Sequence, residues 1–416
     1  MSLSILGICK RAKAASYEVA KISGEIKNAA LCHMANALEA NTEKILAANR
    51  IDVEAAKTRG LKTALLDRLM LDTKKISNMA KDLREVSSLP EPVGAIEKTW
   101  TRPNGLIIGQ LRVPLGVVGV IYESRPNVTS DSAGICIKSG NAVILRGGSD
   151  AINSNIAIGE VLRNALIGSG VPANAIQVVS CPDRSSAEKL MSMRHYIDVL
   201  VPRGGADLIK TVIEKSRIPV IETGTGNCHV YVCEDANLEK AIPIIINAKC
   251  QRPGVCNAAE KLLVDKSIAK AFLPKAIAAL RENGVEIRGD QETQKIIPNV
   301  KSATEIDWYT EYLDLIMGVK VVADLDEAIA HINKYSSKHS DSILTENFDK
   351  ALKFIKLVDS AAVYWNASTR FTDGNQFGLG AEIGISTQKL HARGPMSAQH
   401  LTTIKYFVLG RGHIRE

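Results

Sequence analysis

The sequence has 416 residues with 52 basic and 45 acidic side chains, a net charge of +7 and 45% hydrophobic residues. This length exceeds one ordinary hydrophobic core, so we expect a globular protein of two domains. The basic residues are scattered and only 4% of residues are aromatic, which argues against a nucleic-acid or carbohydrate platform and favours small anionic ligands.

The first residues show no secretory signal, and the longest apolar runs fall far short of the ~20 residues that span a bilayer. We therefore expect a cytoplasmic protein with no membrane segment and with reduced thiols. The eight cysteines form no Cys-x-x-Cys pair, and the eight histidines supply no His-Glu-x-x-His motif. No metal site is expected.

Helical periodicity dominates the first hundred residues. Apolar residues recur at three- and four-residue spacing over 27–57 and 61–86, and the Pro-containing stretch 87–94 ends this pattern. Residues 101–114 contain a Pro-Asn-Gly turn signal and predict a hairpin, while the apolar run 116–123 predicts a buried strand. The core sheet is therefore expected to begin near residue 116.

Strands and helices then alternate. Helices are predicted around 129–139, 151–167, 186–194 and 206–215, with strands over 141–146, 176–180, 198–201 and 219–222. Such alternation is typical of a parallel, doubly wound sheet, which binds nucleotides at the carboxyl ends of its strands.

A second alternating series begins near residue 225. Its predicted strands are 229–234, 261–265, 285–289, 318–324, 341–346 and 361–366. The β-rich tail, residues 400–410, has no strand near it in sequence. We expect it to pair with the 101–114 hairpin or with another subunit.

Common nucleotide-binding and hydrolase motifs are absent from the sequence. No window matches G-x-G-x-x-G, G-x-x-x-x-G-K-[ST] or G-x-S-x-G, and residues 378–384 approach the first of these with the wrong spacing. These absences disfavour a standard Rossmann dehydrogenase, a P-loop NTPase and a common serine hydrolase.

Three segments, at 113–148, 221–232 and 251–264, contain the motifs "ESRPNVT", "ETGTGNCHVYV" and "RPGVCNAAE". In this order they resemble the core motifs of the aldehyde dehydrogenase superfamily, and the resemblance extends over nearly the whole chain. It implies an α/β fold with two doubly wound, Rossmann-like domains and a small β oligomerisation arm. The implied NADP(H)-binding domain is 1–100 with 115–224, the catalytic domain is 225–393, and the arm is 101–114 with 394–416.

Cys256, taken from the residues alone, could be a nucleophile, a metal ligand or a small hydrophobe beside a turn. The resemblance makes it the nucleophile. Asn127 matches the side-chain donor to the oxyanion, beside the backbone N–H of Cys256, and would otherwise be a turn residue. Glu222, 34 residues before the cysteine, matches the general base of the superfamily. Here it could serve the reverse reaction, gate protons or be a structural acid at a strand end.

NADPH/NADP is the cofactor that the resemblance implies. Arg146 matches the position of a lysine that binds the adenosine ribose. With Ser149 it would favour a 2′-phosphate, because a guanidinium forks onto phosphate oxygens. Gly204 and Gly205 would let backbone N–H groups approach the pyrophosphate. Glu311 resembles the acid that binds the nicotinamide ribose, although an exposed turn acid would look the same.

Within the superfamily, the motifs resemble the branch that reduces L-glutamyl 5-phosphate to L-glutamate 5-semialdehyde and phosphate through a cysteine thioester, in L-proline biosynthesis. Arg125 and Arg252 flank the proposed donor and nucleophile, and they are candidates for binding the phosphate or carboxylate; each could instead form a surface ion pair. Residues 252–255 replace the Gly-Gln pair of ordinary aldehyde dehydrogenases, and this departure favours an anionic substrate.

Two other functions stay open. A related enzyme could oxidise a different aldehyde to its acid or acyl-CoA, and a non-catalytic relative could bind nucleotide as a sensor or scaffold. The expected partners are further copies of the chain, in a homodimer or homotetramer, and a glutamate 5-kinase that could channel the substrate. Neither nucleic acid nor a membrane is an expected partner.

Overall fold

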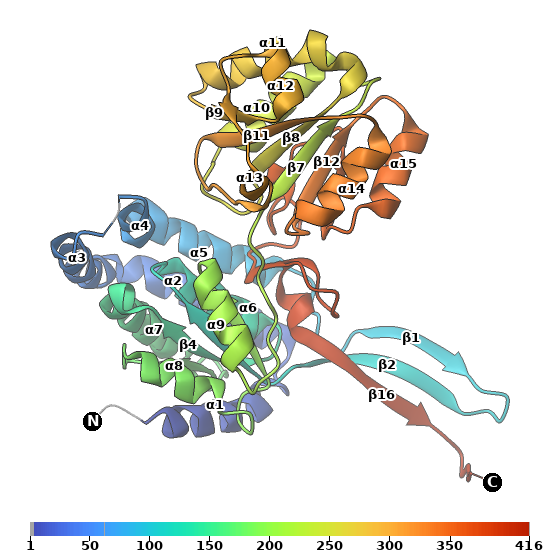
Figure 1. The fold of residues 1–416 in the computed structure, drawn as a ribbon. Helices are drawn as coiled ribbons and strands as arrows, with labels where there is room; N and C mark the ends of the chain where they lie inside the picture. Colours follow the sequence, from blue (N-terminus) through green and yellow to red (C-terminus); the bar gives the residue numbers. More distant parts are fainter. Residues whose placement is uncertain (1–3, 62, 416) are drawn as a thin grey trace. The chain divides into compact units, whose positions relative to one another are not determined.

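The computed structural model describes residues 4–61 and 63–415, which divide into two compact units (Figure 1). The first unit comprises the described residues up to Thr223, Gly378–Gly384 and the described residues from Pro395 onward. The second unit comprises Gly224–Phe377 and Ile385–Gly394. Each unit contains a parallel sheet covered by helices, so the predicted α/β class is confirmed.

The first unit opens with helices, and those after the first one fall in or around the ranges 27–57 and 61–86 in which the periodicity predicted them. The helices are α1 (Ile5–Val19), α2 (Gly24–Ala40), α3 (Thr42–Thr58), α4 (Thr63–Leu69) and α5 (Thr73–Ser88). The side chains of Ser4, Ser23 and Asp72 accept backbone N–H bonds at the starts of α1, α2 and α5, which satisfies donors that a helix end leaves open. No helix within residues 4–61 and 63–415 is long and apolar enough to cross a membrane.

A four-stranded parallel sheet forms the centre of the first unit, in the order β5-β4-β3-β6. Its strands are β3 (Val117–Tyr122), β4 (Ala142–Gly147), β5 (Ile176–Val178) and β6 (Val199–Arg203). The connecting helices are α6 (Asn127–Lys138), α7 (Ile152–Leu166), α8 (Arg184–Met191) and α9 (Ala206–Lys215), with short 3₁₀ turns η1 (Ser149–Ala151) and η2 (Ala173–Ala175). The chain moves outward from β3 and then returns to β6 on its other side, which creates the switch point where such sheets bind ligands.

The predicted strand at 219–222 is not formed. Only Val220 bridges to Leu200 of β6. Pro219 precedes this bridge, and because proline has no backbone N–H it cannot donate to a ladder. The prediction from apolar character alone was therefore wrong for this segment.

An antiparallel three-stranded sheet, β1-β2-β16, completes the first unit. Its strands are β1 (Ile96–Thr101), β2 (Ile107–Pro114) and β16 (Thr402–Leu409). The C-terminal strand pairs with β2 of the hairpin, one of the two pairings expected for the tail. The hairpin starts at Ile96, five residues before the predicted boundary, and Gly105 supplies the positive φ of 90° that its turn requires.

The second unit has a seven-stranded parallel sheet in the order β10-β9-β11-β8-β7-β12-β13. Its strands are β7 (Cys228–Val232), β8 (Ala259–Asp265), β9 (Glu286–Gly289), β10 (Lys301–Ser302), β11 (Ile316–Val322), β12 (Ser340–Leu344) and β13 (Ala362–Trp365). Its helices are α10 (Leu238–Cys250), α11 (Lys266–Glu282), α12 (Gln291–Ile296), α13 (Glu305–Tyr309), α14 (Leu325–Tyr335) and α15 (Phe348–Leu357). The six predicted strands are confirmed, and the two-residue β10 is an addition.

The remaining short elements lie towards the C-terminus. They are η3 (Thr369–Phe371), β14 (Gly384–Ser386), β15 (Gly394–Met396) and η4 (Ala398–Leu401), with β14 and β15 paired as a two-stranded ladder.

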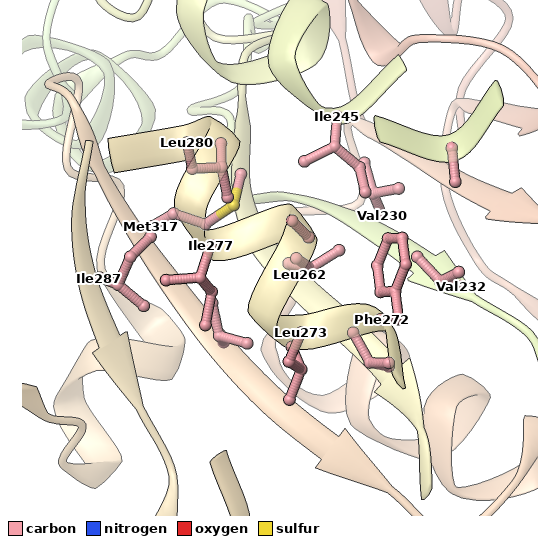
Figure 2. Close-up of a cluster of buried hydrophobic side chains, with 14 of the residues drawn as sticks. Val230, Val232, Ile245, Leu262, Phe272, Leu273, Ile277, Leu280, Ile287 and Met317 are labelled. Atoms are coloured by element: carbon pink, nitrogen blue, oxygen red, sulfur yellow. The ribbon is translucent and has the colours of Figure 1, made fainter. Parts of the chain in front are cut away.

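Helix α11 forms much of the core of the second unit. Figure 2 shows Phe272, Leu273 and Ile277 of α11 packed with Leu262 of β8 and Met317 of β11, and all five side chains are buried. Burial of one such side chain contributes about 1.5–3 kcal/mol to stability. This packing fixes the strands, and the fixed strands hold the loops at their ends.

One edge of the second sheet gathers loops that are far apart in sequence. Because all its strands are parallel, the segments that precede β7, β8 and β11 lie at the same edge. These segments are residues 224–227, 251–258 and 310–315. Cys256 and Glu311 belong to two of them, so they lie at the amino ends of strands, the edge opposite to the ligand crevice of an ordinary doubly wound sheet.

Candidate active site

The loop of Cys256 joins the end of α10 to the start of β8, and the Cys256 side chain is partly exposed. Its peptide packs directly against Gly226. A Cβ atom on Gly226 would lie 1.5 Å from the carbonyl oxygen of Cys256 and 2.5 Å from its Cα atom. The Sγ of the buried Cys228 donates to that carbonyl oxygen at 3.2 Å. The backbone of Cys256 is therefore held from the side of β7.

Asn257, the next residue, anchors the loop from its other side. Its Nδ2 donates to the carbonyl oxygen of Thr372 at 2.8 Å, and its own carbonyl oxygen accepts from Thr369 Oγ1 at 2.7 Å. Arg370 donates through Nη1 to Asn257 Oδ1 and through Nε to Gln251 Oε1 at 2.8 Å. Because both ends of the loop are fixed, the cysteine between them has a defined position.

Cys256 differs from most other cysteines of the chain in its surroundings. Cys9, Cys136, Cys228 and Cys233 are buried. Desolvation raises the pKa of the Cys9 thiol to about 11 and also raises the pKa of Cys136, Cys228 and Cys233. These four thiols therefore stay protonated and unreactive at neutral pH.

Glu311 reaches the same glycine from the loop before β11. Its Oε1 accepts the backbone N–H of Gly226 at 2.6 Å, and desolvation raises the pKa of this carboxyl. The structure thus brings Cys256 and Glu311, two of the predicted site residues, into contact with one and the same residue. Gly226 itself was not predicted as a site residue.

A pocket on the second unit borders the cysteine loop. Its lining residues are Asn247, Gln251, Arg370, Phe371, Asp373 and Gln376. Arg252, one of the predicted substrate-binding residues, is exposed in the adjoining loop. No motif in the sequence had pointed to Arg370, which lies more than a hundred residues from the cysteine.

Asn127 is the first residue of α6 in the first unit, and its side chain is exposed. Its Nδ2 donates to Asp131 Oδ2 at 2.8 Å, one helical turn later. Asp131 is only partly exposed, and desolvation, with repulsion from Asp82, raises the pKa of its carboxyl to about 7. Arg125, the second predicted substrate-binding residue, is partly buried two residues before Asn127. Asp131 was not predicted as part of the site, although its four-residue spacing from Asn127 places both on one face of a helix.

Arg146 lies at the carboxyl end of β4 and is largely buried. Part of its guanidinium group donates hydrogen bonds to the protein itself. Its Nη2 donates to the carbonyl oxygens of Pro182 at 2.8 Å and Asp183 at 3.1 Å, and its Nε donates to Ser186 Oγ at 3.4 Å. Nη1 has no hydrogen-bond partner among the described residues, so its two N–H groups remain for an anion. Ser149 is exposed at the start of η1.

Gly204 and Gly205 precede α9 at the switch point between β3 and β6, and both are exposed. The N–H of Gly205 donates to Glu123 Oε2 at 2.9 Å. A carboxylate therefore occupies the helix N-terminus that was predicted to approach a pyrophosphate. Arg146, on the neighbouring strand β4, supplies donors for an anion at the same carboxyl end of the sheet, whereas the Glu123 carboxylate at the N-terminus of α9 opposes a second anion there.

The predicted site residues are divided between the units. The first unit contains Arg125, Asn127, Arg146, Ser149, Gly204, Gly205 and Glu222. Cys256, Glu311 and Arg252 belong to the second.

The sequence and the structure were compared with protein families and with solved structures. The sequence model of the aldehyde dehydrogenase family matches residues 4–316. A crystal structure of a propionaldehyde dehydrogenase from Rhodopseudomonas palustris has the same fold, with a TM-score of 0.72 at 17% identity over 98% of each chain. The chain therefore belongs to the aldehyde dehydrogenase family.

Within that family the chain is similar to enzymes named gamma-glutamyl phosphate reductase. The enzyme of Thermoanaerobacter pseudethanolicus is 60% identical over 98% of both chains, and that of Carboxydothermus hydrogenoformans is 58% identical over 99% of both. The crystal structure of the Thermotoga maritima enzyme superposes with a TM-score of 0.97 at 52% identity, covering 99% of this chain and 100% of that one.

Substitution of Gly226 tests the contact that holds Cys256. Gly226→Ala should lower turnover about 100-fold, because its Cβ would force the backbone of Cys256 to move by an ångström or more. The rate at which iodoacetamide alkylates Cys256 should also change. Gly224→Ala is the control with a smaller expected effect, because its Cβ would meet only the Thr387 side chain, with Cγ2 at 2.6 Å and Oγ1 at 2.9 Å, and no backbone atom. Parent activity in Gly226→Ala would refute the role of this contact.

Substitution of Asp131 tests its raised pKa. The native carboxyl binds its proton up to a pH of about 7, whereas an unfolded Asp ionises near ~3.9. The native state therefore loses stability relative to the unfolded state as the pH rises from about 4 to about 7. Asp131→Asn should flatten this decline in the thermal midpoint, whereas Asp349→Asn, at an exposed position, should keep it. Parallel curves for both variants and the parent would contradict the assignment.

Proposed function

We propose that this chain is an NADPH-dependent reductase that converts L-glutamyl 5-phosphate to L-glutamate 5-semialdehyde and phosphate, a step of L-proline biosynthesis. The observation that carries the proposal is Cys256 itself, a partly exposed thiol in a loop fixed on both sides. The names of relatives 53–60% identical to this chain support the substrate.

Cys256 supplies the nucleophile of the first step. Its thiolate attacks the acyl carbon, a C–S bond forms, and the C–O bond to phosphate breaks with release of phosphate. The product is a thioester on Cys256. An acylated cysteine is reported for the propionaldehyde dehydrogenase from Rhodopseudomonas palustris, which shares the fold.

Asn127 is the proposed donor to the oxyanion that forms as the thiolate attacks. An amide Nδ2 has two hydrogens, and one of them is directed at Asp131. The second remains for the developing negative charge. A preorganised donor of this kind contributes about 3 kcal/mol to the stability of the transition state. In this proposal Asp131 orients the amide and Asn127 binds the oxyanion.

The proposed cofactor contacts are those that the family resemblance assigns, residue by residue. Arg146 through Nη1 and Ser149 would bind a 2′-phosphate, Gly204 and Gly205 the pyrophosphate, and Glu311 the nicotinamide ribose. NADPH, when bound, supplies the hydride that reduces the thioester. Cys256 then leaves as a thiolate while the aldehyde forms. An engineered glycolyl-CoA reductase of the same fold, 17% identical, has been solved with bound NADP⁺.

Glu222 takes no hydrolytic step in this scheme. In aldehyde-oxidising enzymes the matching acid activates water, and water here would waste the acyl phosphate. Its proposed roles are those left open by the sequence: a base for the reverse reaction, a proton gate or a structural acid.

Arg252 and Arg125 are the proposed cations for the phosphate and the carboxylate of the substrate. Arg252 is exposed in the loop of the nucleophile, and Arg125 lies beside Asn127 in sequence. Arg370, which lines the neighbouring pocket, adds a third cation to this set.

The β1-β2-β16 sheet is proposed to join copies of the chain in a homodimer or homotetramer. The exposed apolar side chains of this sheet support the proposal, and they are Ile96, Ile107, Ile404, Tyr406, Val408 and Leu409. Both β1 and β16 also leave an unpaired edge that a second copy could extend. Association with a glutamate 5-kinase stays a prediction from the family resemblance, as does a cytoplasmic location.

Phosphate dependence tests the proposed reaction in reverse. With glutamate 5-semialdehyde, NADP⁺ reduction should require inorganic phosphate and should be faster than NAD⁺ reduction. Cys256→Ala should abolish it, whereas Cys32→Ala, at a partly exposed cysteine of α2 to which no role is assigned, should not. Oxidation without phosphate would instead indicate an aldehyde-oxidising enzyme, and absence of turnover under every condition would favour a non-catalytic nucleotide-binding protein.

A further inference from the structure

Lys261 carries a completely buried ammonium group on β8, five residues after Cys256. Its Nζ donates to Asn227 Oδ1 at 2.8 Å and to the carbonyl oxygen of Thr310 at 2.8 Å. Asn227 immediately precedes β7, and Thr310 lies in the loop before β11. Since β8 lies between β7 and β11, this one group ties together the loops on both sides of the nucleophile's strand.

Asn227 has no freedom to turn away from the lysine. Its Nδ2 donates to the carbonyl oxygens of Trp308 at 2.7 Å and Tyr335 at 2.8 Å, while its backbone N–H donates to Ser337 Oγ at 2.8 Å. The side-chain oxygen is thus left to accept from Lys261. The position of the amide fixes the backbone of Gly226, the residue before it.

The loop that carries Glu311 is held at the residues around it. Lys261 Nζ lies 4.5 Å from the ring centroid of Tyr312, and the hydroxyl of Tyr312 donates to Asp307 Oδ1 at 2.9 Å. The N–H of Leu313 donates to Glu260 Oε1 at 3.1 Å, and Leu313 itself has a left-handed φ of 55°. Glu311 therefore sits between anchored neighbours.

Accommodating the Lys261 side chain requires a glycine on the neighbouring strand and the desolvation of a charged group. A Cβ on Gly318 of β11 would lie 2.9 Å from Lys261 Cδ, so glycine is required to accommodate the side chain. Desolvation lowers the pKa of Lys261 to about 7, although the carboxylate of Glu260 opposes that shift. Even the neutral amine keeps two N–H donors for its two oxygen acceptors. A buried ammonium is expensive compared with an apolar side chain of similar size, so stability alone does not explain it.

We propose that Lys261 is a positioning residue that fixes Gly226 between Cys256 and Glu311. By joining Asn227 to Thr310, it couples the turn that supports the peptide of Cys256 to the loop that presents Glu311. The inference rests on the proposed function only for the roles given to Cys256 and Glu311. The coupling itself is a property of the second unit.

Three variants of the full chain test this coupling. Lys261→Met removes both hydrogen bonds, and Lys261→Arg keeps a cation that can donate to both oxygens. Lys138→Met is the matched control, because Lys138 is equally buried in the first unit and its Nζ also donates to an asparagine, Asn28, and to a backbone carbonyl, that of Ser87.

Hydrogen exchange without cofactor is the first measurement. Lys261→Met should accelerate exchange in peptides that cover 224–228 and 309–314 together, while Lys138→Met leaves both at the parent rate. In steady-state assays Lys261→Met should raise the KM for NADPH about tenfold, the effect of losing a buried hydrogen bond, and lower kcat less. Lys261→Arg should restore most of that KM.

The proposal fails if Lys261→Met keeps parent exchange in either segment, or if Lys138→Met changes the KM for NADPH to the same extent. If Lys261→Met does not fold, Gly318→Ala is the deciding variant, because the new Cβ would displace the Lys261 side chain without removing its charge. Gly318→Ala should then accelerate hydrogen exchange in the same two segments. Absence of phosphate-dependent turnover in the parent would refute the proposed function, whereas the exchange result would still decide the coupling.

Discussion

The contact between Gly226 and the peptide of Cys256 is the constraint on which the second unit's part of the site depends. No side chain can stand at residue 226, because its Cβ would overlap the carbonyl group of the cysteine. The same glycine donates its N–H to Glu311. A single residue without a side chain therefore sets the position of the proposed nucleophile and of the proposed ribose ligand. Rigid positioning of this kind is what makes a reacting geometry effective.

Buried polar groups of α10, β8 and the neighbouring strands hold the loops that make this contact. Lys249 and Glu260 form a fully buried ion pair at 2.9 Å, and the second oxygen of Glu260 accepts from the loop of Glu311. On the far side of β7, the ring of His229 lies 3.1 Å from Asp341 Oδ1, again fully buried. Buried charges are costly unless their hydrogen bonds are satisfied, so the Lys249–Glu260 pair specifies one arrangement of the loops rather than adding much stability.

The sequence predicts the elements of this fold better than the geometry of its site. Alternating apolar runs predicted the six longer strands of the second sheet, because a strand buried on both faces needs a continuous apolar run. The same criterion failed at 219–222, where proline removes a donor. Motifs predicted Cys256 and Glu311 as site residues but did not predict the groups that hold them in place. The hydrogen bonds of Lys261 and Arg370 join segments about 30 to 110 residues apart, and such pairings follow from strand order, which no local pattern encodes.

The central claim is that Cys256 carries the acyl group between phosphate release and reduction. Glutaryl phosphate tests it directly, since it lacks the amine that would let a glutamyl group cyclise off the enzyme. Mixed with the protein in the absence of cofactor, it should release one phosphate per chain in a burst and add one glutaryl group to the peptide that contains Cys256. Phosphate release without that adduct, or an adduct on another residue, would contradict the account.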